Sequence, residues 1–533
     1  MKRFLLGLAA ATALWTASCG GGGSVATPPP PVGGFTNASL KGQFAFVTNG
    51  EVINTSGTET PLARTGSFIA DGNGNITSGV EDVVAPNAAP NLDITITSGT
   101  YTINADGRGT LALNVTSGGV PSTINFGIVL TSANNGLLMD ETSTSSQAST
   151  GSGNFFPQNT TAFTNPVLPT TATYVFDFSG EDVNMAPDSF VGEFTAGNDA
   201  ITAGFEDVNA DFALSNGAIP PGALMADPAD TGSLLTFGRG VATIAGESYV
   251  FYIVDSTRIR FISTSGGAMF SGDAVIQDNT IPTTASSINS GFAYVVAGSS
   301  SVGVGLTRVG RFTANAGNLT NIEVDTNNGG TFTSTTGATI ANIMLDPAHL
   351  GRGTISISGN GLSIPLTFVF YLSSAKQGVI QETTMSAGIP IAVADGTVAQ
   401  QSGAPFSASN ITGTYAINWS GQSIQNGFTD EEDLAGQVKV SNLSLAGAAD
   451  IFQFTAGAAQ TNVVTSGTIA ITGDGTGSPA SATRNTMQIK VTSSSSTTVN
   501  FVVYFVNPQL AFIANNQGSS RVVAGVLKAQ QTP

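Results

Sequence analysis

The chain has 533 residues, and only 10% of them are charged. Its 35 acidic residues outnumber its 17 basic ones and give a net charge of −18, which argues against nucleic acid and anionic lipid surfaces as partners. With one cysteine and one histidine, the chain has no disulfide framework and little scope for thiol or imidazole chemistry, so its domains depend on core burial alone.

The chain begins with the features of an export signal. Lys2 and Arg3 form a short basic region, and an apolar run follows from Phe4 to Trp15. This run is about a dozen residues long, whereas a helix needs ~20 to cross a bilayer. The layout therefore predicts a signal peptide over residues 1–18 rather than a membrane span.

The end of this signal predicts a lipid-attachment site. Residues 16–19, Thr-Ala-Ser-Cys, resemble a lipobox, with Thr16 where the family prefers Leu. Cys19 is the only cysteine and stands at the expected cleavage point, so we expect it to be lipidated. The alternative is ordinary cleavage after a small residue, which would leave a free thiol by chance. Removal of the signal would change the net charge from −18 to −20.

Residues 19–37 predict a tether that carries the lipidated cysteine. Residues 20–23 are glycines and residues 28–31 are prolines, so a flexible stretch leads into a stiffer one that would hold a folded body off a surface. Gly20, in place of Asp directly after the cysteine, resembles the pattern of lipoproteins sorted to the outer membrane. We therefore expect an exported outer-membrane lipoprotein, at the cell surface or periplasmic face, with the membrane as a partner through its lipid anchor.

Four blocks recur in the same order along the rest of the chain and define a repeat. Each unit opens with an aromatic residue followed six residues later by Gly, and between them alternate positions are mostly apolar, as in a half-buried strand. A Gly-x-Phe block, which has drifted to Gly-Gln-Val at residues 436–438 of the fourth unit, a Gly-Arg-Gly block and a closing Gly with Gln five residues later follow. The four openings begin at Phe44, Tyr174, Phe292 and Tyr415, and the closing residues are Gln158, Gln277, Gln401 and Gln530.

The repeat predicts four domains of ordinary size, at residues 38–158, 171–277, 288–401 and 409–531. Pro-containing junctions at residues 159–170, 278–288 and 402–410 separate them. Proteolysis at these junctions is expected to release fragments of single-domain size.

Each unit predicts an all-β domain. Seven or eight strand candidates follow one another at about 10–14 residue spacing, with Asp-Gly and Asn-Gly pairs in the turns and no convincing helix. This pattern favours an antiparallel meander closed into a small up-and-down barrel, loosely similar to the lipocalin and avidin class. An immunoglobulin-like sandwich is the alternative.

An aspartate recurs at one place in three units: Asp82, Asp207 and Asp325, with Glu81 and Glu206 beside two of them. Such carboxylates could bind calcium or a ligand hydroxyl. The favoured interpretation is an acid at a strand end or one that bonds backbone amides. The turn at residues 71–75 superficially resembles a calcium loop but lacks Gly at its sixth place, and a hairpin turn explains it without metal.

An arginine also recurs in three units, between two glycines: Arg108, Arg239 and Arg352. It could anchor a carboxylate or sulfate on each domain. The favoured interpretation is structural, with each Arg paired inside its own domain, conceivably with the recurring aspartate. In the fourth unit Thr476 replaces the Arg and no clear aspartate match is present, so a repeated site is expected to be threefold.

No other pattern indicates chemistry. We predict that His349, which lies in a turn, is a surface residue, and that Trp419 faces a domain core. No nucleophile elbow or phosphate loop is found, so we expect no catalytic residue, metal site or cofactor.

The repeat units resemble those of uncharacterised tandem β-domain repeat lipoproteins of environmental diderm bacteria. The resemblance rests on the Ala-Asp-Gly-x-Gly-x-Ile segment at residues 70–76 and the Asp-Gly-Arg-Gly-Thr segment at residues 106–110, and it covers the chain from about residue 38. It implies surface display and brings no activity with it.

Two classes of function are therefore expected. The first is a non-enzymatic, surface-displayed array that binds an extracellular polymer or a cell-surface protein by weak multivalent contacts. The second is a small-ligand carrier, if the barrels have open interiors. Large inward side chains would favour the first. An extracytoplasmic hydrolase is a third, less favoured alternative.

Overall fold

In the computed structural model, the described residues are 34–54, 58–144, 147–337, 340–359, 362–425, 428–453, 459–471, 484–492, 496–518 and 521–531. The predicted signal peptide, Cys19 and most of the tether lie outside them, as does Thr476. The described part is all-β and consists of four closed eight-stranded antiparallel barrels in tandem. The prediction of tandem up-and-down barrels is confirmed.

Barrels 1 and 4 are plain meanders, in which each strand pairs with the next and the last pairs with the first. The strands of barrel 1 are β1 (Lys41–Asn54), β2 (Glu59–Asp71), β3 (Asn75–Val84), β4 (Asn91–Ile103), β5 (Arg108–Ser117), β6 (Val120–Ser132), β7 (Asn135–Asp140) and β8 (Gln147–Pro157). Those of barrel 4 are β29 (Gly413–Gln425), β30 (Phe428–Ser441), β31 (Ser444–Gln453), β32 (Gln460–Ile471), β33 (Arg484–Thr492), β34 (Ser496–Asn507), β35 (Leu510–Asn515) and β36 (Arg521–Ala529).

Barrel 2 has the same meander with one added strand. Pairing of β10 with β11 closes it, and β12 extends the sheet from β11. Its strands are β9 (Ala172–Glu181), β10 (Pro187–Gly197), β11 (Ala200–Ala210), β12 (Ala213–Ala218), β13 (Gly222–Ala226), β14 (Arg239–Ile244), β15 (Glu247–Asp255), β16 (Arg258–Ser263) and β17 (Met269–Ile276). A short helix, α1 (Thr231–Phe237), precedes β14 and ends at Gly238 with φ 70°, a left-handed cap that favours glycine.

Barrel 3 likewise carries an added strand, β21, and a small hairpin of β26 and β27. Its strands are β18 (Asn289–Ser300), β19 (Gly305–Asn315), β20 (Asn318–Asn328), β21 (Thr331–Thr336), β22 (Ile340–Leu345), β23 (Arg352–Ser358), β24 (Leu366–Ser374), β25 (Gln377–Glu382), β26 (Met385–Ser386), β27 (Ile389–Pro390) and β28 (Ala392–Gln400). Three single-turn 3₁₀ helices lie before barrels 1, 2 and 3, at Asn37–Ser39, Thr160–Ala162 and Ala285–Ser287.

Side-chain alternation explains why these strands close into barrels with filled interiors. In barrel 1, Phe44 and Phe46 point inward and pack against Phe68 and Phe155, with ring centroids 5.3 to 5.9 Å apart for the pairs that touch. The strands also approach closely at glycines: a Cβ on Gly153 would lie 1.8 Å from the carbonyl oxygen of Val47. The repeated glycines therefore let neighbouring backbones tilt past one another while the aromatic rings fill the barrel.

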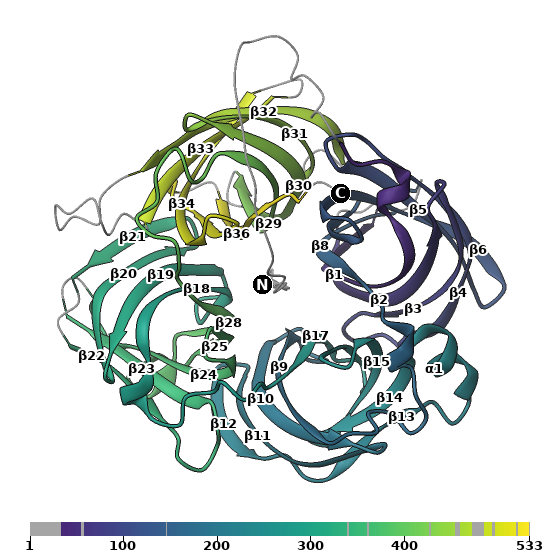
Figure 1. The fold of residues 1–533 in the computed structure, drawn as a ribbon, viewed down its shortest axis with the longest axis horizontal. Coiled ribbons are helices and arrows are strands. Elements are labelled where there is room, and N and C mark those ends of the chain that lie inside the picture. Colours follow the sequence, from purple (N-terminus) through teal and green to yellow (C-terminus); the bar gives the residue numbers. More distant parts are fainter. Residues whose placement is uncertain are drawn as a thin grey trace.

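The four barrels form a closed ring, and the first and last strands of each barrel face its middle (Figure 1). Barrel 4 lies beside barrel 1, where the amide of Gln531 donates to the carbonyl of Thr131 at 2.8 Å. The same backbone link occurs at the three other junctions, between the residue after the closing Gln and the next barrel. These bonds run from Asn159 to Val254, from Asp278 to Ser373 and from Ser402 to Val506.

Buried apolar clusters at each junction hold the barrels against one another. The junction between barrels 1 and 2 packs Val80 and Phe156 against Val250 and Met269. Corresponding clusters join barrels 2 and 3, barrels 3 and 4, and barrels 4 and 1. The units are therefore packed against one another rather than connected only by linkers.

The ring has two distinct faces. Strand direction alternates around each barrel. The connections that correspond to β1–β2, β3–β4, β5–β6 and β7–β8 therefore lie at one end of the barrel, and the chain enters and leaves at the other end. At the first end, the Asn87 amide donates to the Gly267 carbonyl across a junction, and Asn209 Nδ2 donates to the Ala392 carbonyl across the next. Equivalent ends thus lie on the same side of the ring. We call the two sides the hairpin face and the linker face.

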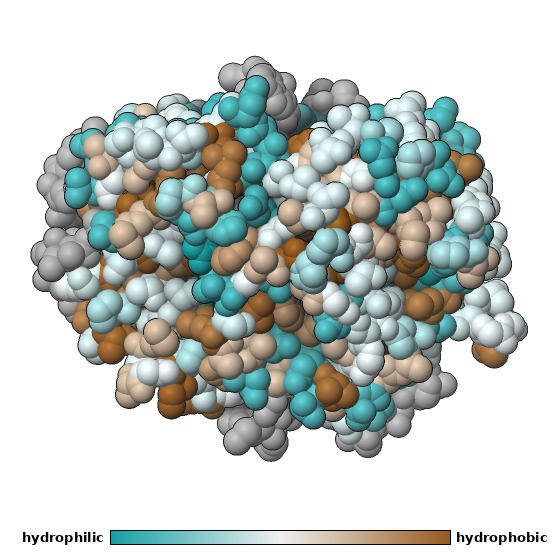
Figure 2. Space-filling model, turned by 90° about the horizontal axis from the view of Figure 1, so that it is seen from below, coloured by the Kyte–Doolittle hydropathy of each residue, from teal (hydrophilic) through white to brown (hydrophobic). Residues whose placement is uncertain are grey.

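The outer surface mixes apolar, neutral and hydrophilic residues when the ring is seen from its edge (Figure 2). Within the described ranges, no helix has both the length and the apolar character needed to cross a bilayer.

Candidate functional site

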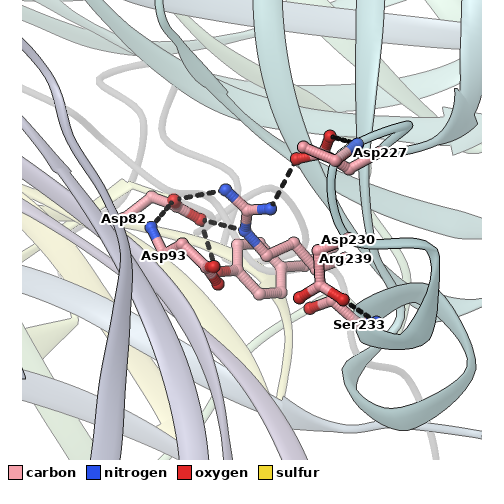
Figure 3. Close-up of polar contacts among 8 residues, drawn as sticks. Asp82, Asp93, Asp227, Asp230, Ser233 and Arg239 are labelled. Carbon is pink, nitrogen blue, oxygen red and sulfur yellow. Dashed lines mark hydrogen bonds and ion pairs between the residues drawn. The ribbon is translucent and has the colours of Figure 1, made fainter.

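The recurring aspartate and arginine do meet, but across barrel junctions. Asp82 in β3 of barrel 1 accepts two hydrogen bonds from Arg239 in β14 of barrel 2, at 3.0 Å from Nε and 2.8 Å from Nη2 (Figure 3). Asp207 and Arg352 join barrels 2 and 3 in the same way, at 2.7 Å for both bonds. The expectation that the arginine pairs with the recurring aspartate of its own domain is therefore wrong, although Arg239 and Arg352 each also pair with another acid inside their own domain.

The third such junction uses an arginine that the repeat pattern did not reveal. Arg484, the first residue of β33, donates from Nε and Nη2 to Asp325 of barrel 3 at 2.9 Å each. It stands between Thr and Asn rather than between glycines, so it carries no Gly-Arg-Gly signal. The fourth unit therefore keeps the arginine, displaced in sequence but not in the fold.

A tyrosine completes each of the three sites. Tyr252 pairs with Arg239 in the β14–β15 register, and its hydroxyl donates to Asp82 at 2.5 Å. The matching bonds run from Tyr371 to Asp207 at 2.6 Å and from Tyr504 to Asp325 at 2.5 Å. Each aspartate thus accepts a bidentate arginine and a phenol from the next barrel, an arrangement that neutralises a buried carboxylate. We call these three sites the junction triads.

Burial and charge act together in the triads. Asp82 is fully buried and Arg239 is 2% exposed. Burial by itself lowers the pKa of Arg239, but the hydrogen bonds and charge of Asp82 outweigh it and hold that pKa above its ordinary value. Burial, reinforced by the nearby charge of Asp82, raises the pKa of Tyr252, so this phenol stays protonated and acts as a donor.

A second acid contacts the outer side of the triad arginines. Arg239 Nη1 lies 3.2 Å from Asp227 Oδ2, and Arg352 Nη1 lies 2.9 Å from Asp346 Oδ2. Both acids come from the turn before the arginine's own strand and are about a fifth exposed. Protein carboxylates therefore bind the guanidinium of Arg239 and of Arg352 on two sides and accept from three of its five N–H donors.

The junction of barrels 4 and 1 lacks this arrangement. Asp450 of β31 occupies the aspartate position, since its Oδ1 accepts from the Asn462 amide at 2.6 Å as Asp82 accepts from the Asp93 amide at 2.8 Å. Arg108 binds Asp106 in its own barrel at 2.9 Å and reaches Asn462 at 2.9 Å. Val129 stands opposite Arg108 in the strand register, where the other barrels have tyrosine.

This closing junction therefore differs chemically from the other three. Asp450 is held beside Glu141, whose pKa burial raises to about 8 with a further contribution from the Asp450 charge. The expectation that the fourth unit lacks both residues is wrong, because Asp450 and Arg484 occupy the two positions there. Arg108 belongs to none of the triads, whereas Arg484 belongs to one.

The closing glutamines also act across junctions, a role that their position in the repeat did not suggest. Gln158 Nε2 donates to the carbonyls of Phe237 and Ile253 in barrel 2. Gln530 Nε2 donates to those of Asp106 and Leu130 in barrel 1, at 2.9 and 2.8 Å. These bonds lie on the linker face. The glutamines that donate them close the repeat at the same point in every unit.

Buried charges inside the hairpin end of the barrels escaped the sequence analysis as well. In barrel 1, Arg64 lies 3.3 Å from Asp140 and 3.6 Å from Glu81. In barrel 4, Arg521 donates to Glu432, which also accepts from Trp419 Nε1. An alternating strand pattern places these residues inward, but only the closed barrel shows which of them meet.

The remaining candidates have structural surroundings. Asp71 Oδ1 accepts from the amides of Asn73 and Asn75 in the β2–β3 hairpin, and these bonds lower its pKa to about 2, side-chain bonding by Asn75 being the largest cause. Trp419 is buried in the core of barrel 4, as expected. His349 is 25% exposed and stacks on Phe205 of barrel 2 with ring centroids 3.8 Å apart.

The described residues form no metal cluster, and barrel 3 contains a small apolar cavity. The described residues contain no group of three or more acidic, histidine or cysteine side chains arranged to hold a metal ion. Barrel 3 contains an apolar cavity of about 20 Å³, lined by Phe292, Phe312 and Phe370 among others. A space of this size holds about one water molecule.

Comparisons with known proteins add little to this picture. No protein-family model matches the chain, and no curated protein does either. Two variants of transferrin binding protein B from Haemophilus parasuis align with 9% and 10% identity and TM-scores of 0.21 and 0.20, over 74% and 92% of this chain and 83% and 96% of theirs. Kievitone hydratase from Nectria haematococca aligns with 10% identity and a TM-score of 0.20, over 48% of this chain and 91% of its own. Similarity at this level supports no transfer of function.

Proposed function

We propose that this protein is a non-enzymatic, surface-displayed lipoprotein whose ring of barrels is a rigid platform for binding an extracellular polymer or a cell-surface protein. The observation that carries the proposal is that the recurring charged residues bond to one another across the junctions. Arg239 and Asp82, for example, might have belonged to a repeated ligand or catalytic site. Instead they bind each other, and Tyr252 and Asp227 bind them as well. What the ring offers to a partner is its outer surface.

The filled barrels favour this function over that of a small-ligand carrier. Aromatic clusters occupy the barrel interiors, and the cavity of about 20 Å³ in barrel 3 is far below the ~300 Å³ of typical small-molecule sites. A carrier would need these aromatic side chains to move aside. Packing of this kind resists such motion, because filled cores lose several kcal/mol when contacts open, on the order of 2–5 for one large side chain.

The position of the first described residues supports an outward-facing ring. The amide of Phe35 donates to the carbonyl of Ala105 at 3.2 Å, in the β4–β5 turn on the linker face of barrel 1. If the predicted tether is lipidated at Cys19, the linker face is turned towards the membrane and the hairpin face away from it. The resemblance to tandem-repeat lipoproteins of diderm bacteria implies surface display, which fits a ring held on such a tether.

Two experiments test the proposal. Cys19→Ala should release the protein from the membrane fraction, with Thr16→Leu as a control that keeps or improves the lipobox. Continued membrane association of Cys19→Ala would contradict the lipoprotein assignment. A binding screen of the full mature ring against peptidoglycan, glycans and surface proteins should yield a partner without turnover. Conversion of any screened compound would contradict the non-enzymatic assignment.

A further inference from the structure

One arc of the hairpin face exposes large apolar side chains. Of the eleven such side chains exposed in the described ranges, five lie in the β9–β10, β18–β19 and β25–β28 connections, which open on this face in barrels 2 and 3. They are Val183 (45% exposed), Met185 (39%), Val302 (76%), Met385 (53%) and Ile389 (61%). We call these five residues the apolar arc. Single exposed apolar residues are common on protein surfaces, but a contiguous group is not.

Contacts between neighbouring connections join the segments that carry the arc. The amide of Asp211 donates to the carbonyl of Pro187, which joins the β11–β12 turn to the turn that carries Val183 and Met185. Strand β12 then contacts β27, next to Ile389. On the far side, the amide of Ser301 donates to the carbonyl of Ile391, which places Val302 beside the β26–β27 hairpin.

The arc is built on additions to the repeat. Strand β12 extends the sheet of barrel 2 beyond the eight strands that close it, and the β26–β27 hairpin replaces a plain connection in barrel 3. Neither addition is needed to close a barrel or to form a junction triad. The four connections that carry or flank the arc, residues 182–187, 211–221, 300–304 and 383–391, contain two aspartates, Asp182 and Asp211, and no lysine or arginine.

We propose that the apolar arc is the docking surface for a protein partner that presents basic side chains beside apolar ones. This inference rests on the proposed binding function and names the chemistry of its partner. Charge complementarity selects that occupant, because the arc is acidic within a chain of net charge −18. The same charge opposes an anionic membrane and a second copy of the chain. The arc also lies on the face opposite the first described residues, where a tethered ring is open to other molecules.

The test uses the full mature chain with Cys19→Ala and fluorescently labelled probe peptides. The probes are an amphipathic peptide of Lys and Leu, a matched peptide of Glu and Leu, and a matched peptide of Lys and Ser. We expect the first to bind at least about tenfold more tightly than the other two, since both charge and apolar area contribute. Equal binding of the Glu–Leu or Lys–Ser peptide would overturn the proposal.

A matched pair of variants locates the binding. V302S/M385S/I389S should weaken binding of the Lys–Leu peptide about tenfold or more, and Asp211→Asn should weaken it less. M344S/L350S removes apolar side chains that are 61% and 47% exposed on the linker side of barrel 3, and it should leave binding unchanged. Unchanged urea midpoints would show that all variants fold, because exposed substitutions cost little stability.

Three results would overturn this inference while leaving the wider binding function intact. The first is Lys–Leu binding that the arc variant does not alter. The second is concentration-dependent dimerisation of the chain that the arc variant abolishes, which would assign the arc to a second copy. The third is arc-dependent binding to phosphatidylcholine vesicles in preference to the peptide. Failure of the whole ring to bind any polymer or protein in the screen would instead contradict the proposed function.

Discussion

Arg239 and Asp82 lie 157 positions apart in the chain and form a buried, bidentate ion pair between two barrels. Two further pairs repeat this relationship, so the same contact ties barrel 1 to 2, 2 to 3 and 3 to 4. Side chains at repeated positions therefore join three of the four junctions, beside the apolar clusters found at all four. A residue at the same position in each copy can bond to the next copy as readily as to its own.

The first prediction concerns this pair. Arg239→Met leaves Asp82 buried with the Tyr252 hydroxyl and the Asp93 amide to stabilise its charge. Breaking a buried pair from one side costs roughly 3–5 kcal/mol. We expect a correspondingly lower urea midpoint. Arg108→Met is the control, because Arg108 belongs to no triad and binds Asp106 of its own barrel and the neutral Asn462, and we expect it to lower the midpoint less. Equal losses in the two variants would show that the junction triads do not stabilise the ring.

Much of the fold could be predicted, but the pairing could not. The alternating strands, hairpin turns and recurring blocks indicated four barrels, because side-chain period and turn chemistry are local properties. Asp82 and Arg108 belong to one unit in the sequence, so a pair within the unit was the natural expectation. Which copy a side chain faces depends on how whole barrels pack, and no local pattern encodes that.

The same limit explains the residues that were missed in the fourth unit. Asp450 lies in Ala-Ala-Asp-Ile rather than beside Glu, and Arg484 lacks its flanking glycines. Their positions in β31 and β33 are nevertheless those of Asp82 and Arg108 in β3 and β5. The one available signal was a tyrosine in the strand that follows the arginine, present as Tyr504 in the fourth unit and absent as Val129 in the first.

The second prediction is that the ring opens first between barrels 4 and 1. This junction has no covalent link and no triad, and its aspartate faces Glu141. In hydrogen exchange, the amides of β31 and β6 at this junction should lose protection before those of β3 and β15 at the first junction. Uniform protection across the four junctions would contradict the prediction.

Gln530→Ala sharpens this test. It removes two hydrogen bonds to backbone carbonyls at the closing junction, each contributing about 1 kcal/mol. Gln158→Ala removes the same two kinds of bond at a junction that keeps its triad. We expect Gln530→Ala to accelerate exchange in β6 and β31, and Gln158→Ala to have little effect on β3 and β15.

The third prediction concerns pH. Glu81 is 1% exposed, and burial raises its pKa to about 7, with smaller raising effects of Asp140 and Asp82 that the charge of Arg64 opposes. Between its ordinary value of 4.5 and about 7, the folded chain keeps a proton that the unfolded chain releases. This contribution to stability is therefore complete below about 4.5, falls as the pH rises to about 7, and is constant above it.

Glu81→Gln should remove that dependence. At pH 8 the variant should be more stable than the natural chain, by up to roughly 3 kcal/mol, because it needs no buried charge. Its denaturation midpoint should also change less between about pH 4 and about pH 8, which lie on either side of the window from 4.5 to about 7. Asp71→Asn is the control, since the pKa of Asp71 is lowered to about 2 and the group is ionised throughout this range. A variant that loses stability at pH 8 would contradict the assignment.

The last prediction revises the expected outcome of proteolysis. Separate domains on exposed linkers would part once the junctions were cut. In the structure, each junction is covered by a backbone bond after the closing Gln and by a buried apolar cluster, such as that of Val80 and Phe156 with Val250 and Met269. Cleavage at residues 159–170, 278–288 or 402–410 should therefore give barrel-sized bands on a denaturing gel but a single particle of full mass on a native column. Arg239→Met should release barrel 1 from a chain cut between barrels 1 and 2 at lower urea concentration than the natural chain requires. If cut barrels separate without denaturant, the junctions hold the ring only through the covalent chain.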